Sequence, residues 1–386
     1  MKIVVAPDSF KESLTSLQAA TAIAQGIRES IPSAQVEIAP MADGGEGTVE
    51  ALTAAAKGTL HHAIVCGPLG LPIETTYGLI ARRSDVGDSE TATRTAVIEA
   101  ASLFGLQQTP ASRRDPYVTT TRGMGELLLQ LLDEGIRSFV IGLGGSATND
   151  GGMGLLAALG ARFYDADERL LPGFGRDLPE VRRIDGSGLD SRLADCDILV
   201  ASDVRNQLCG EQGASAVYGP QKGATPEQIA ALDEALRRYA SLWAEEAGRA
   251  AMEIPGAGAA GGAGYALLLL GARMAPGAEV VASEARLREK LADADWVVTG
   301  EGKSDAQTLF GKLPVYVARL AKSAGVRTIL LSGSLGDNAR ELESEFAACF
   351  PCVPRPMALA ECLEQAEDHL RSCARNVARL LSAQAR

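Results

Sequence analysis

The chain of 386 residues has 49 acidic and 37 basic side chains, and its formal net charge at pH 7 is −12. With 46% hydrophobic and 22% charged residues, its composition is that of a folded globular protein rather than a disordered one. The acidic balance, without any Lys/Arg-rich run, argues against a nucleic-acid-binding protein. The length exceeds one ordinary hydrophobic core, so we expect two domains.

The sequence does not indicate export or membrane insertion. The apolar run in the amino-terminal stretch MKIVVAPDS is about four residues long, too short for a signal peptide, and no run approaches the about 20 residues of a membrane span. The seven scattered cysteines suit a reducing cytoplasm, where we expect the protein to reside. Cys349 and Cys352 have the C-x-x-C spacing of redox motifs, but their apolar surroundings favour buried packing.

The first part of the chain alternates strands and helices. Strands are predicted at 2–6 and 36–40, and helices at 16–30 and 48–56. This order implies a parallel sheet. The polar residues that follow both strands therefore lie at its carboxyl edge, where open α/β sheets bind their ligands.

From about residue 59 the pattern changes. Short β-type runs at 59–65, 75–81 and 95–99 predict antiparallel strands of a different domain. Further along we expect a helix at 120–133, strands at 161–164 and 198–201, a loop at 172–188, and a helix from Thr225 to Ala247 that begins with a capping box.

A glycine-rich stretch lies in the middle of this region. The strand 139–143 runs into Gly144-Gly145-Ser146-Ala147-Thr148-Asn149-Asp150-Gly151-Gly152, and a helix is predicted from Met153 to Leu159. Backbone N–H groups at such a helix start form a ready anion site.

The parallel-strand pattern returns near the carboxyl terminus. The strand 296–299 ends in a polar loop, Gly300 to Asp305, and is followed by a helix at 317–324, strands at 328–331 and 347–353, and a closing helix at 359–383. We therefore predict a discontinuous first domain, 1–58 plus 285–386, with a second, mixed α/β domain inserted at 59–284.

Several motifs suggest other classes of protein. Gly142-x-Gly144-x-x-Ala147 loosely fits a dinucleotide-binding turn, so an NAD-dependent oxidoreductase on a Rossmann-like domain stays an alternative, although the segment 148–152 delays the helix start. Gly302-Lys303-Ser304 resembles the end of a P-loop, but Val297 stands where that motif needs glycine. The only three histidines, His61, His62 and His369, disfavour a Ser-His-Asp hydrolase or a His-ligated zinc enzyme.

Acidic residues and lysines gather in the loops that follow strands. Such a set suits phosphoryl transfer, which needs carboxylates for Mg²⁺, cations and N–H groups for phosphate oxygens, and a proton acceptor. A non-catalytic nucleotide or metabolite sensor would use the same groups and stays open. The set comprises Asp8, Lys11, Asp43, Glu46, Asn149, Asp150, Asp203, Asn206, Lys222, Glu301, Lys303, Asp305 and Lys312.

Ordered stretches covering almost the whole chain resemble the bacterial glycerate kinase family, of the type I fold, whose members phosphorylate the 2-hydroxyl of glycerate. Gln207 departs from the family, where Pro is expected. The matching stretches are APDSFKESL (6–14), ADGGEGT (42–48), TTTRGMGELL (119–128), GLGGSATNDGGMGLLAALG (142–160), ASDVRNQLCG (201–210), YGPQKGA (218–224), GAAGGAG (258–264) and TGEGKSDAQTLFGK (299–312).

The resemblance implies ATP, Mg²⁺ and D-glycerate as ligands and 2-phosphoglycerate as product, with phosphorylation at the 3-hydroxyl as the alternative. It also implies a flavodoxin-like domain, a second α/β domain and an active site in the cleft between them. A homo-oligomer stays open.

From the resemblance and the positions of these loops we assign roles to site residues. The assigned roles are catalysis for Asp203 and Asp305; glycerate binding for Ser9, Lys11, Asp43, Gly44, Gly45 and Glu46; phosphate binding for Gly144, Gly145, Ser146, Asn149, Asp150, Lys222, Lys303 and Lys312; and metal binding for Glu301 and Asp305.

Overall fold

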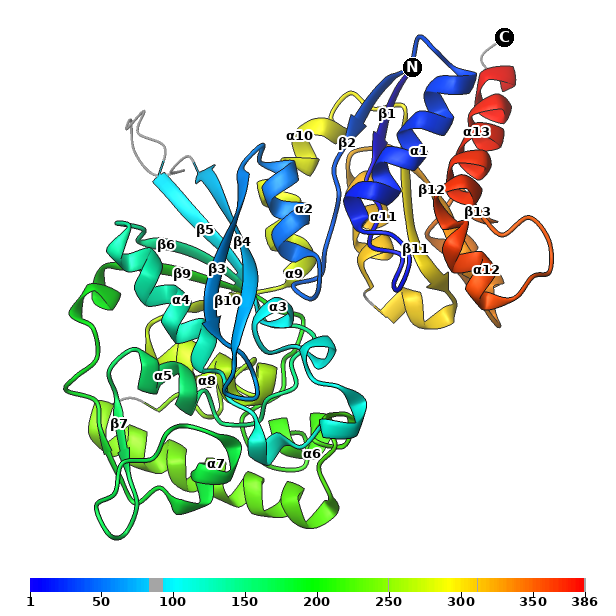
Figure 1. Ribbon diagram of the computed structural model, residues 1–386. Coiled ribbons are helices and arrows are strands. Elements are labelled where there is room, and N and C mark those ends of the chain that lie inside the picture. Colours follow the sequence, from blue (N-terminus) through cyan, green and yellow to red (C-terminus); the bar gives the residue numbers. More distant parts are fainter. Residues whose placement is uncertain (83–92, 249, 311, 385–386) are drawn as a thin grey trace. The chain divides into compact units, whose positions relative to one another are not determined.

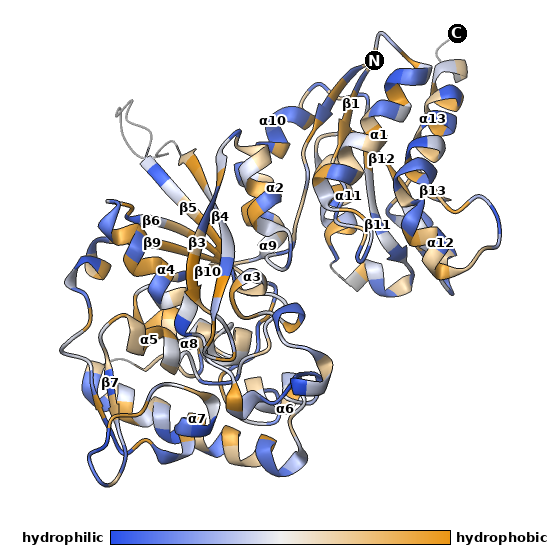
Figure 2. Ribbon diagram, viewed as in Figure 1, coloured by the Kyte–Doolittle hydropathy of each residue, from blue (hydrophilic) through white to orange (hydrophobic). Residues whose placement is uncertain are grey.

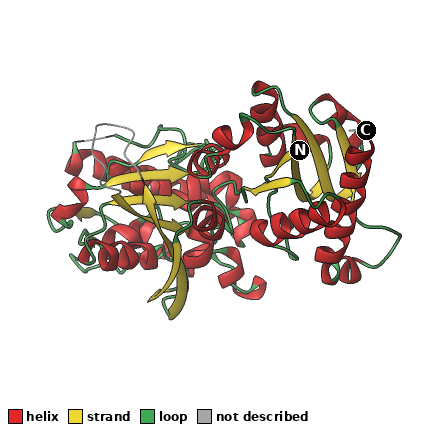
Figure 3. Ribbon diagram, turned by 90° about the horizontal axis from the view of Figure 1, so that it is seen from above, coloured by secondary structure: helices red, strands yellow, loops and turns green. Residues whose placement is uncertain are grey.

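The chain forms two compact units (Figure 1). The structure is a computed structural model that describes residues 1–82, 93–248, 250–310 and 312–384. The first unit consists of Met1–Asp43, Glu50–Lys57 and Ala278–Arg386, and the second of Gly44–Val49 and Gly58–Gly277. Each unit contains a β-sheet flanked by helices (Figure 3), which confirms the predicted α/β fold class. The domain limits expected from the sequence stay a prediction.

The first unit contains a five-stranded parallel sheet with the order β2-β1-β11-β12-β13. Numbered within this unit, the strands follow the order 2-1-3-4-5, which is the flavodoxin-like order expected. The strands are β1 (Lys2–Val5), β2 (Gln35–Ile38), β11 (Trp296–Ser304), β12 (Arg327–Leu335) and β13 (Ala348–Pro351). The helices are α1 (Ser16–Ser30), α2 (Thr48–Ala55), α9 (Gly277–Glu284), α10 (Leu287–Leu291), α11 (Leu313–Ser323), α12 (Leu359–Glu364) and α13 (Ala366–Gln384).

The two faces of this sheet are covered by different helices. Side chains of successive strand residues point to opposite faces. Ile329 and Leu331 of β12 therefore pack in one cluster with α1 and α13, whereas Leu330 between them packs with Val315 and Ala318 of α11. Hydrophobic and hydrophilic residues alternate along α13 in Figure 2, as expected for a helix with one buried face.

Helix α1 begins and packs as its sequence predicts. The Gln18 N–H donates to Thr15 Oγ1 (3.2 Å) and the Thr15 N–H donates to Gln18 Oε1 (2.9 Å), which completes a capping box. Gly26 faces α13, where a Cβ atom would lie 2.2 Å from the carbonyl oxygen of Arg371. The close approach of the two helices therefore requires glycine at this position.

The second unit contains a six-stranded mixed sheet with the order β10-β9-β6-β5-β4-β3. The first four strands of this order are parallel, and β4 pairs antiparallel with both β3 and β5. The expected antiparallel pairing of residues 95–99 thus holds on one side of that strand, while its other side pairs parallel with β6. The strands are β3 (Thr59–Cys66), β4 (Pro72–Arg82), β5 (Thr93–Glu99), β6 (Ser138–Gly142), β9 (Asp197–Ala201) and β10 (Arg273–Ala275), with a separate pair, β7 (Arg162–Tyr164) and β8 (Arg183–Asp185).

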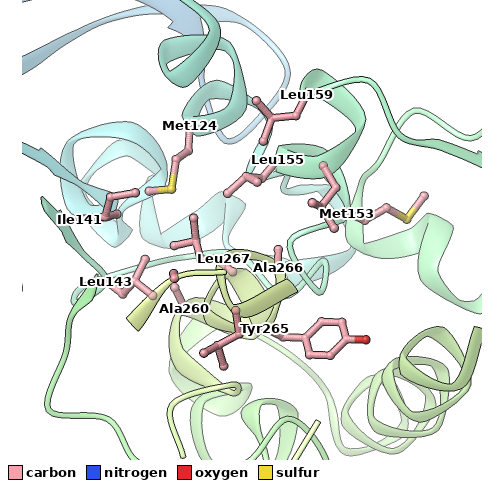
Figure 4. Packing of buried hydrophobic residues seen from close by; sticks show 14 of the residues in the cluster. Met124, Ile141, Leu143, Met153, Leu155, Leu159, Ala260, Tyr265, Ala266 and Leu267 are labelled. Carbon is pink, nitrogen blue, oxygen red and sulfur yellow. The ribbon is translucent and has the colours of Figure 1, made fainter. Parts of the chain in front are cut away.

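Helices bury the core of this unit against the sheet. Figure 4 shows Ile141 and Leu143 near Met124 of α4, Leu155 of α5 and Leu267 of α8, in one continuous cluster. Long helix α7 adds Tyr239 and Trp243, which pack against Phe163. The helices are α3 (Ala100–Phe104), α4 (Arg122–Asp133), α5 (Met153–Ala158), α6 (Ala214–Tyr218), α7 (Pro226–Ala247) and α8 (Ala263–Leu269).

Three local predictions were wrong. Residues 300–304 continue strand β11 instead of forming a loop, because β12 pairs with them as far as Ser304. The expected loop at 172–188 contains a 3₁₀ helix, Gly175–Glu180, and strand β8. The closing helix is divided into α12 and α13 at Gln365. Within the described residues, no helix combines the length and apolar character needed to cross a membrane.

We predict that Gly26→Ala lowers the free energy of unfolding by about 1–3 kcal/mol, the usual cost of overpacking a close contact. The added Cβ forces α1 away from α13, and this outweighs the about 1 kcal/mol that alanine gains over glycine in a helix. Urea titration followed by circular dichroism measures the change. Gln25→Ala, at the neighbouring exposed position, is the control and should change stability by at most about 0.5 kcal/mol. Equal stability of the two variants would contradict the packing argument.

Candidate active site

In the first unit, the predicted residues lie at the carboxyl edge of the parallel sheet. Asp8 follows β1, and its N–H donates to the carbonyl oxygen of Gly300 in β11 (2.9 Å). Asp43 lies beyond β2, after Met41, whose N–H donates to Pro7 O (3.0 Å). These bonds hold the ends of three neighbouring strands together and so gather side chains that are far apart in the sequence.

Glu301 is a nearly buried carboxylate with several donors. Its Oε1 accepts hydrogen bonds from Ser304 Oγ (2.9 Å) and Thr308 Oγ1 (2.8 Å), and Lys312 Nζ lies 3.5 Å from its Oε2. These donors fix the position of the Glu301 carboxylate at the sheet edge.

Asp8 lies near the Glu301 carboxylate, and its pKa is higher than the ordinary value of an aspartate. Burial, followed by the nearby carboxylates of Asp43 and Glu301, raises the pKa of Asp8 to about 7, against an opposing effect of the Ser9 N–H and Lys11. A carboxylate that titrates near neutral pH is suited to exchange a proton with a substrate. The sequence places Asp8 in the polar loop, but only the proximity of Asp43 and Glu301 reveals this property.

The other predicted residues of the first unit remain accessible. Lys11, Lys303 and Lys312 have exposed side chains, while Ser9 and Asp305 are half-buried. Asp305 Oδ1 accepts the N–H of Gln307 (2.9 Å), so this carboxylate begins the 3₁₀ helix Ala306–Phe310. The exposed ammonium groups of these three lysines near the sheet edge can therefore bind an anion.

In the second unit, two predicted loops lie against each other. The Gly144 N–H donates to the carbonyl oxygen of Gly44 (2.9 Å). A Cβ on Gly144 would lie 2.5 Å from Gly45 Cα, and one on Gly44 would lie 2.3 Å from Ala201 O. Glycines at 44 and 144 thus allow the backbones of three segments to touch. Gly44 and Gly45, which are expected to bind glycerate, therefore lie beside Gly144, which is expected to bind phosphate.

The N–H groups at the start of α5 are satisfied by the protein itself. Asp150 is fully buried, and its carboxylate accepts the N–H groups of Thr121 (2.7 Å), Gly152 (3.0 Å) and Gly154 (3.2 Å) and the hydroxyl of Thr121 (2.8 Å). Burial raises the pKa of Asp150, and the four hydrogen bonds oppose this shift. The anion at this helix start is therefore the Asp150 side chain, and its predicted contact with a phosphate stays a prediction.

Lys222 and Asn149 also point into the protein. Lys222 is 2% exposed, and its Nζ donates to Thr148 O (2.6 Å). Asn149 Nδ2 donates to Ser215 Oγ (2.8 Å), while its Oδ1 is buried without a hydrogen-bond partner among the described residues. In this structure these side chains hold the loop 144–152 in place from its buried side. Of the predicted phosphate-binding residues here, Gly145 is exposed and Ser146 is buried.

Asp203 follows strand β9 in the segment that touches Gly44. Its carboxylate accepts the N–H of Gly277 (2.8 Å), the first residue of α9. The side chain is exposed, so it can interact with a ligand while it holds this helix start. Glu46, also exposed, accepts a hydrogen bond from Gln107 Nε2 (2.7 Å).

The carboxylates of the first unit fit a magnesium ion in chemical type. Burial and then the nearby carboxylate of Asp43 raise the pKa of Asp8, and a cation would relieve the repulsion between these carboxylates. The described residues contain no group of three or more His, Cys, Asp or Glu arranged to hold a metal. In kinases, Mg²⁺ is usually bound by one or two carboxylates together with phosphate oxygens and water.

Two α/β units that present carboxylates and lysines at strand ends have the features of a small-molecule kinase. Residues 3–382 match the model of the glycerate kinase family. The chain is 46% identical over 378 residues to glycerate kinase of Halalkalibacterium halodurans, covering 97% of each chain, and 44% identical over 384 residues to glycerate 2-kinase of Escherichia coli, covering 99% and 98%. A crystal structure from Salmonella typhimurium LT2, of a protein assigned as a glycerate kinase 2, has a TM-score of 0.86 at 47% identity and covers 100% of this chain and 99% of its own.

The chain therefore belongs to the glycerate kinase family and is a kinase. The oxidoreductase and sensor alternatives lose their support. The structure agrees, because Gly151 and Gly152 both adopt left-handed conformations (φ 66° and 72°) and lengthen the turn before α5, whereas a dinucleotide-binding turn leads directly into its helix.

Sequence reasoning missed two supporting residues. Thr121 donates its hydroxyl to Asp150 and accepts the Leu155 N–H (3.0 Å). Glu99 is buried, and its Oε2 accepts the N–H of Val49 (3.0 Å), next to the loop 43–47. Thr121 lay inside the predicted helix 120–133, whereas the structure makes it the residue before α4. The link over 50 residues from Glu99 to Val49 has no local pattern.

We predict that Lys222→Met removes a pH-dependent contribution to stability. Burial lowers the pKa of Lys222 from 10.5 to about 7. Between these values the unfolded chain binds a proton that the folded chain does not, so this lysine makes the free energy of unfolding rise with pH, by at most about 1.4 kcal/mol per pH unit.

Urea titrations from pH 7 to pH 10 measure this effect as the difference between wild type and variant. The exposed Lys322→Met on α11 serves as the control and should follow the wild type. If Lys222→Met followed the wild type as well, the lysine would be solvated in solution.

Proposed function

We propose that the protein transfers the γ-phosphoryl group of ATP to the 2-hydroxyl of D-glycerate and so forms 2-phosphoglycerate. The observation that carries this proposal is the similarity over the full chain to the Escherichia coli protein named glycerate 2-kinase. The exposed lysines and the carboxylates at the strand ends support it, because phosphoryl transfer depends on positioning and on stabilising negative charge. We place the reaction in the cytoplasm.

In this proposal, glycerate and ATP bind to different groups of the protein. Glycerate carries one carboxylate, which suits the exposed ammonium of Lys11 and the polar residues of its loop, with Ser9 and the segment Asp43 to Glu46 binding the hydroxyl groups. The phosphates of ATP are bound by the backbone of Gly144 to Ser146 and by Lys303 and Lys312. Asn149, Asp150 and Lys222 act on the nucleotide through the loop that they hold.

Glu301 and Asp305 are the proposed magnesium ligands. Mg²⁺, when bound, supplies neutralisation of the charge on the phosphates. Ser304 and Thr308 orient Glu301 by their hydrogen bonds to its Oε1. Lys312 lies close enough to balance the charge of Glu301 before the ligands arrive.

One carboxylate must accept the proton of the attacking hydroxyl. Asp203 is our first choice and Asp305 our second, and Asp8 joins them because of its raised pKa. We predict that Asp203→Asn lowers kcat by about 10²–10⁴-fold and changes the KM for glycerate much less.

Steady-state assays of ADP release compare Asp203→Asn, Asp305→Asn and Asp8→Asn. Asp167→Asn, on an exposed turn with a single ion pair to Arg169, is the matched control and should retain wild-type activity. Near-full turnover in both Asp203→Asn and Asp305→Asn would show that neither accepts the proton, and a loss confined to Asp8→Asn would transfer that role to Asp8.

We predict that the product of ATP and D-glycerate is phosphorylated at carbon 2. Carbon-resolved NMR of the product distinguishes the two positions, since phosphorus couples to different carbons in 2- and 3-phosphoglycerate. Authentic samples of both compounds serve as standards. Coupling at carbon 3 would establish the alternative, a glycerate 3-kinase, and leave the family assignment intact.

A further inference from the structure

A cavity of about 330 Å³ in the first unit lies apart from the residues assigned to the kinase reaction. It opens between the end of β13 and helix α13, and its walls include Cys352, Cys373, His369 and Asn376. None of these residues belongs to a loop with a proposed role in phosphoryl transfer. The cavity is large enough for a small organic molecule with a few polar atoms.

Two thiols meet in the wall of this cavity. Cys352 and Cys373 both line it and pack in the same cluster of side chains, although they are separated in the sequence and come from different segments. Cys352 is 6% exposed, and its N–H donates to Ser332 O (2.7 Å), so its backbone is fixed to strand β12. Cys373 lies on α13, is half-buried, and has its Sγ 4.0 Å from Pro351 O. Cys373 is thus the more accessible of the two thiols.

The pKa values of the two thiols are shifted in opposite directions. The neighbouring Cys352 thiol lowers the pKa of Cys373 below its ordinary value, and the neighbouring Cys373 thiol together with burial raises the pKa of Cys352. A thiolate is the nucleophile in disulfide exchange. The accessible sulfur is therefore also the more nucleophilic one.

The C-x-x-C motif does not supply this pair. Cys349 lies on β13 and packs against the opposite face of the sheet, beside the cluster of Val315 and Leu330, whereas Cys352 packs with the α1 and α13 side. Burial raises the pKa of Cys349 to about 11. Cys352 therefore packs with Cys373 rather than with Cys349, which the sequence spacing does not indicate.

The cavity also offers polar groups beside the sulfur atoms. His369 Nδ1 is buried and has no hydrogen-bond partner among the described residues. Ser372 and Asn376, one residue before and three residues after Cys373, also line the cavity. These groups favour a molecule with hydroxyl or amide groups near its reactive atoms.

We propose that Cys352 and Cys373 form a thiol–disulfide exchange site for small linear disulfides that enter this cavity. The Cys373 thiolate attacks one sulfur of the molecule RSSR, the S–S bond breaks, and RS⁻ leaves and takes up a proton from solvent. Cys352 then attacks the sulfur of Cys373 and displaces the second RS⁻, which receives the Cys352 proton. Two protein thiols are oxidised to one disulfide, and one RSSR is reduced to two RSH.

The experiment treats the reduced full-length protein with bis(2-hydroxyethyl) disulfide at neutral pH and analyses it by intact mass and peptide mapping. Wild type should lose two hydrogen atoms and yield one cross-linked peptide pair that contains Cys352 and Cys373. Cys352→Ser should stop at the first step and gain one hydroxyethylthio group on Cys373, which dithiothreitol removes. Cys373→Ser should form no Cys352 disulfide.

Cys349→Ser is the matched control, because it removes the other cysteine of the C-x-x-C motif and should react as wild type. Circular dichroism of each variant verifies that it is folded. A wild-type protein that remains fully reduced, a cross-link between Cys349 and Cys352, or adducts spread over other cysteines with Cys373 unmodified would each overturn the proposal. Glycerate kinase assays are not needed for this readout, so the result is independent of the proposed reaction.

Discussion

The second unit depends on the hydrogen bonds that the buried carboxylate of Asp150 accepts. It lies fully buried and accepts four hydrogen bonds, two from Thr121 and two from the first turn around α5. A buried charge is tolerated in a protein only when such donors compensate for the water that it has lost. The bonds join the start of α4 to the start of α5, and the loop 144–152 is held in one conformation as a consequence.

Because of this arrangement, the glycine-rich loop 144–152 is not a simple anion site. The N–H groups at the helix start already have an acceptor, so the loop presents its other side, where Gly144 touches Gly44. Backbone contact at that point replaces side-chain contact, because any Cβ would overlap with the neighbouring segment. The loop of Gly44 and the loop of Gly144 therefore act as one surface of the second unit.

Much of the fold followed from local patterns. The parallel sheet of the first unit, helix α1 and helix α7 with its start at Pro226 were predicted from periodicity and capping residues, and the flavodoxin-like strand order was implied by the family resemblance. The continuation of β11 through Gly300 to Ser304 was not, because glycine, glutamate and lysine are poor strand residues by themselves. Pairing with β12 overrides that preference.

The sequence alone determined the family and the approximate positions of the site loops, since motifs in a constant order are readable without coordinates. The tertiary structure decided which of those residues face the solvent. Lys11, Lys303 and Lys312 remain exposed, whereas Asp150 and Lys222 are buried. Tertiary packing also raised the pKa of Asp8 and placed Cys352 in one cluster with Cys373 rather than with Cys349. These properties depend on distances between segments that are remote in the chain, and no local pattern of residues encodes such distances.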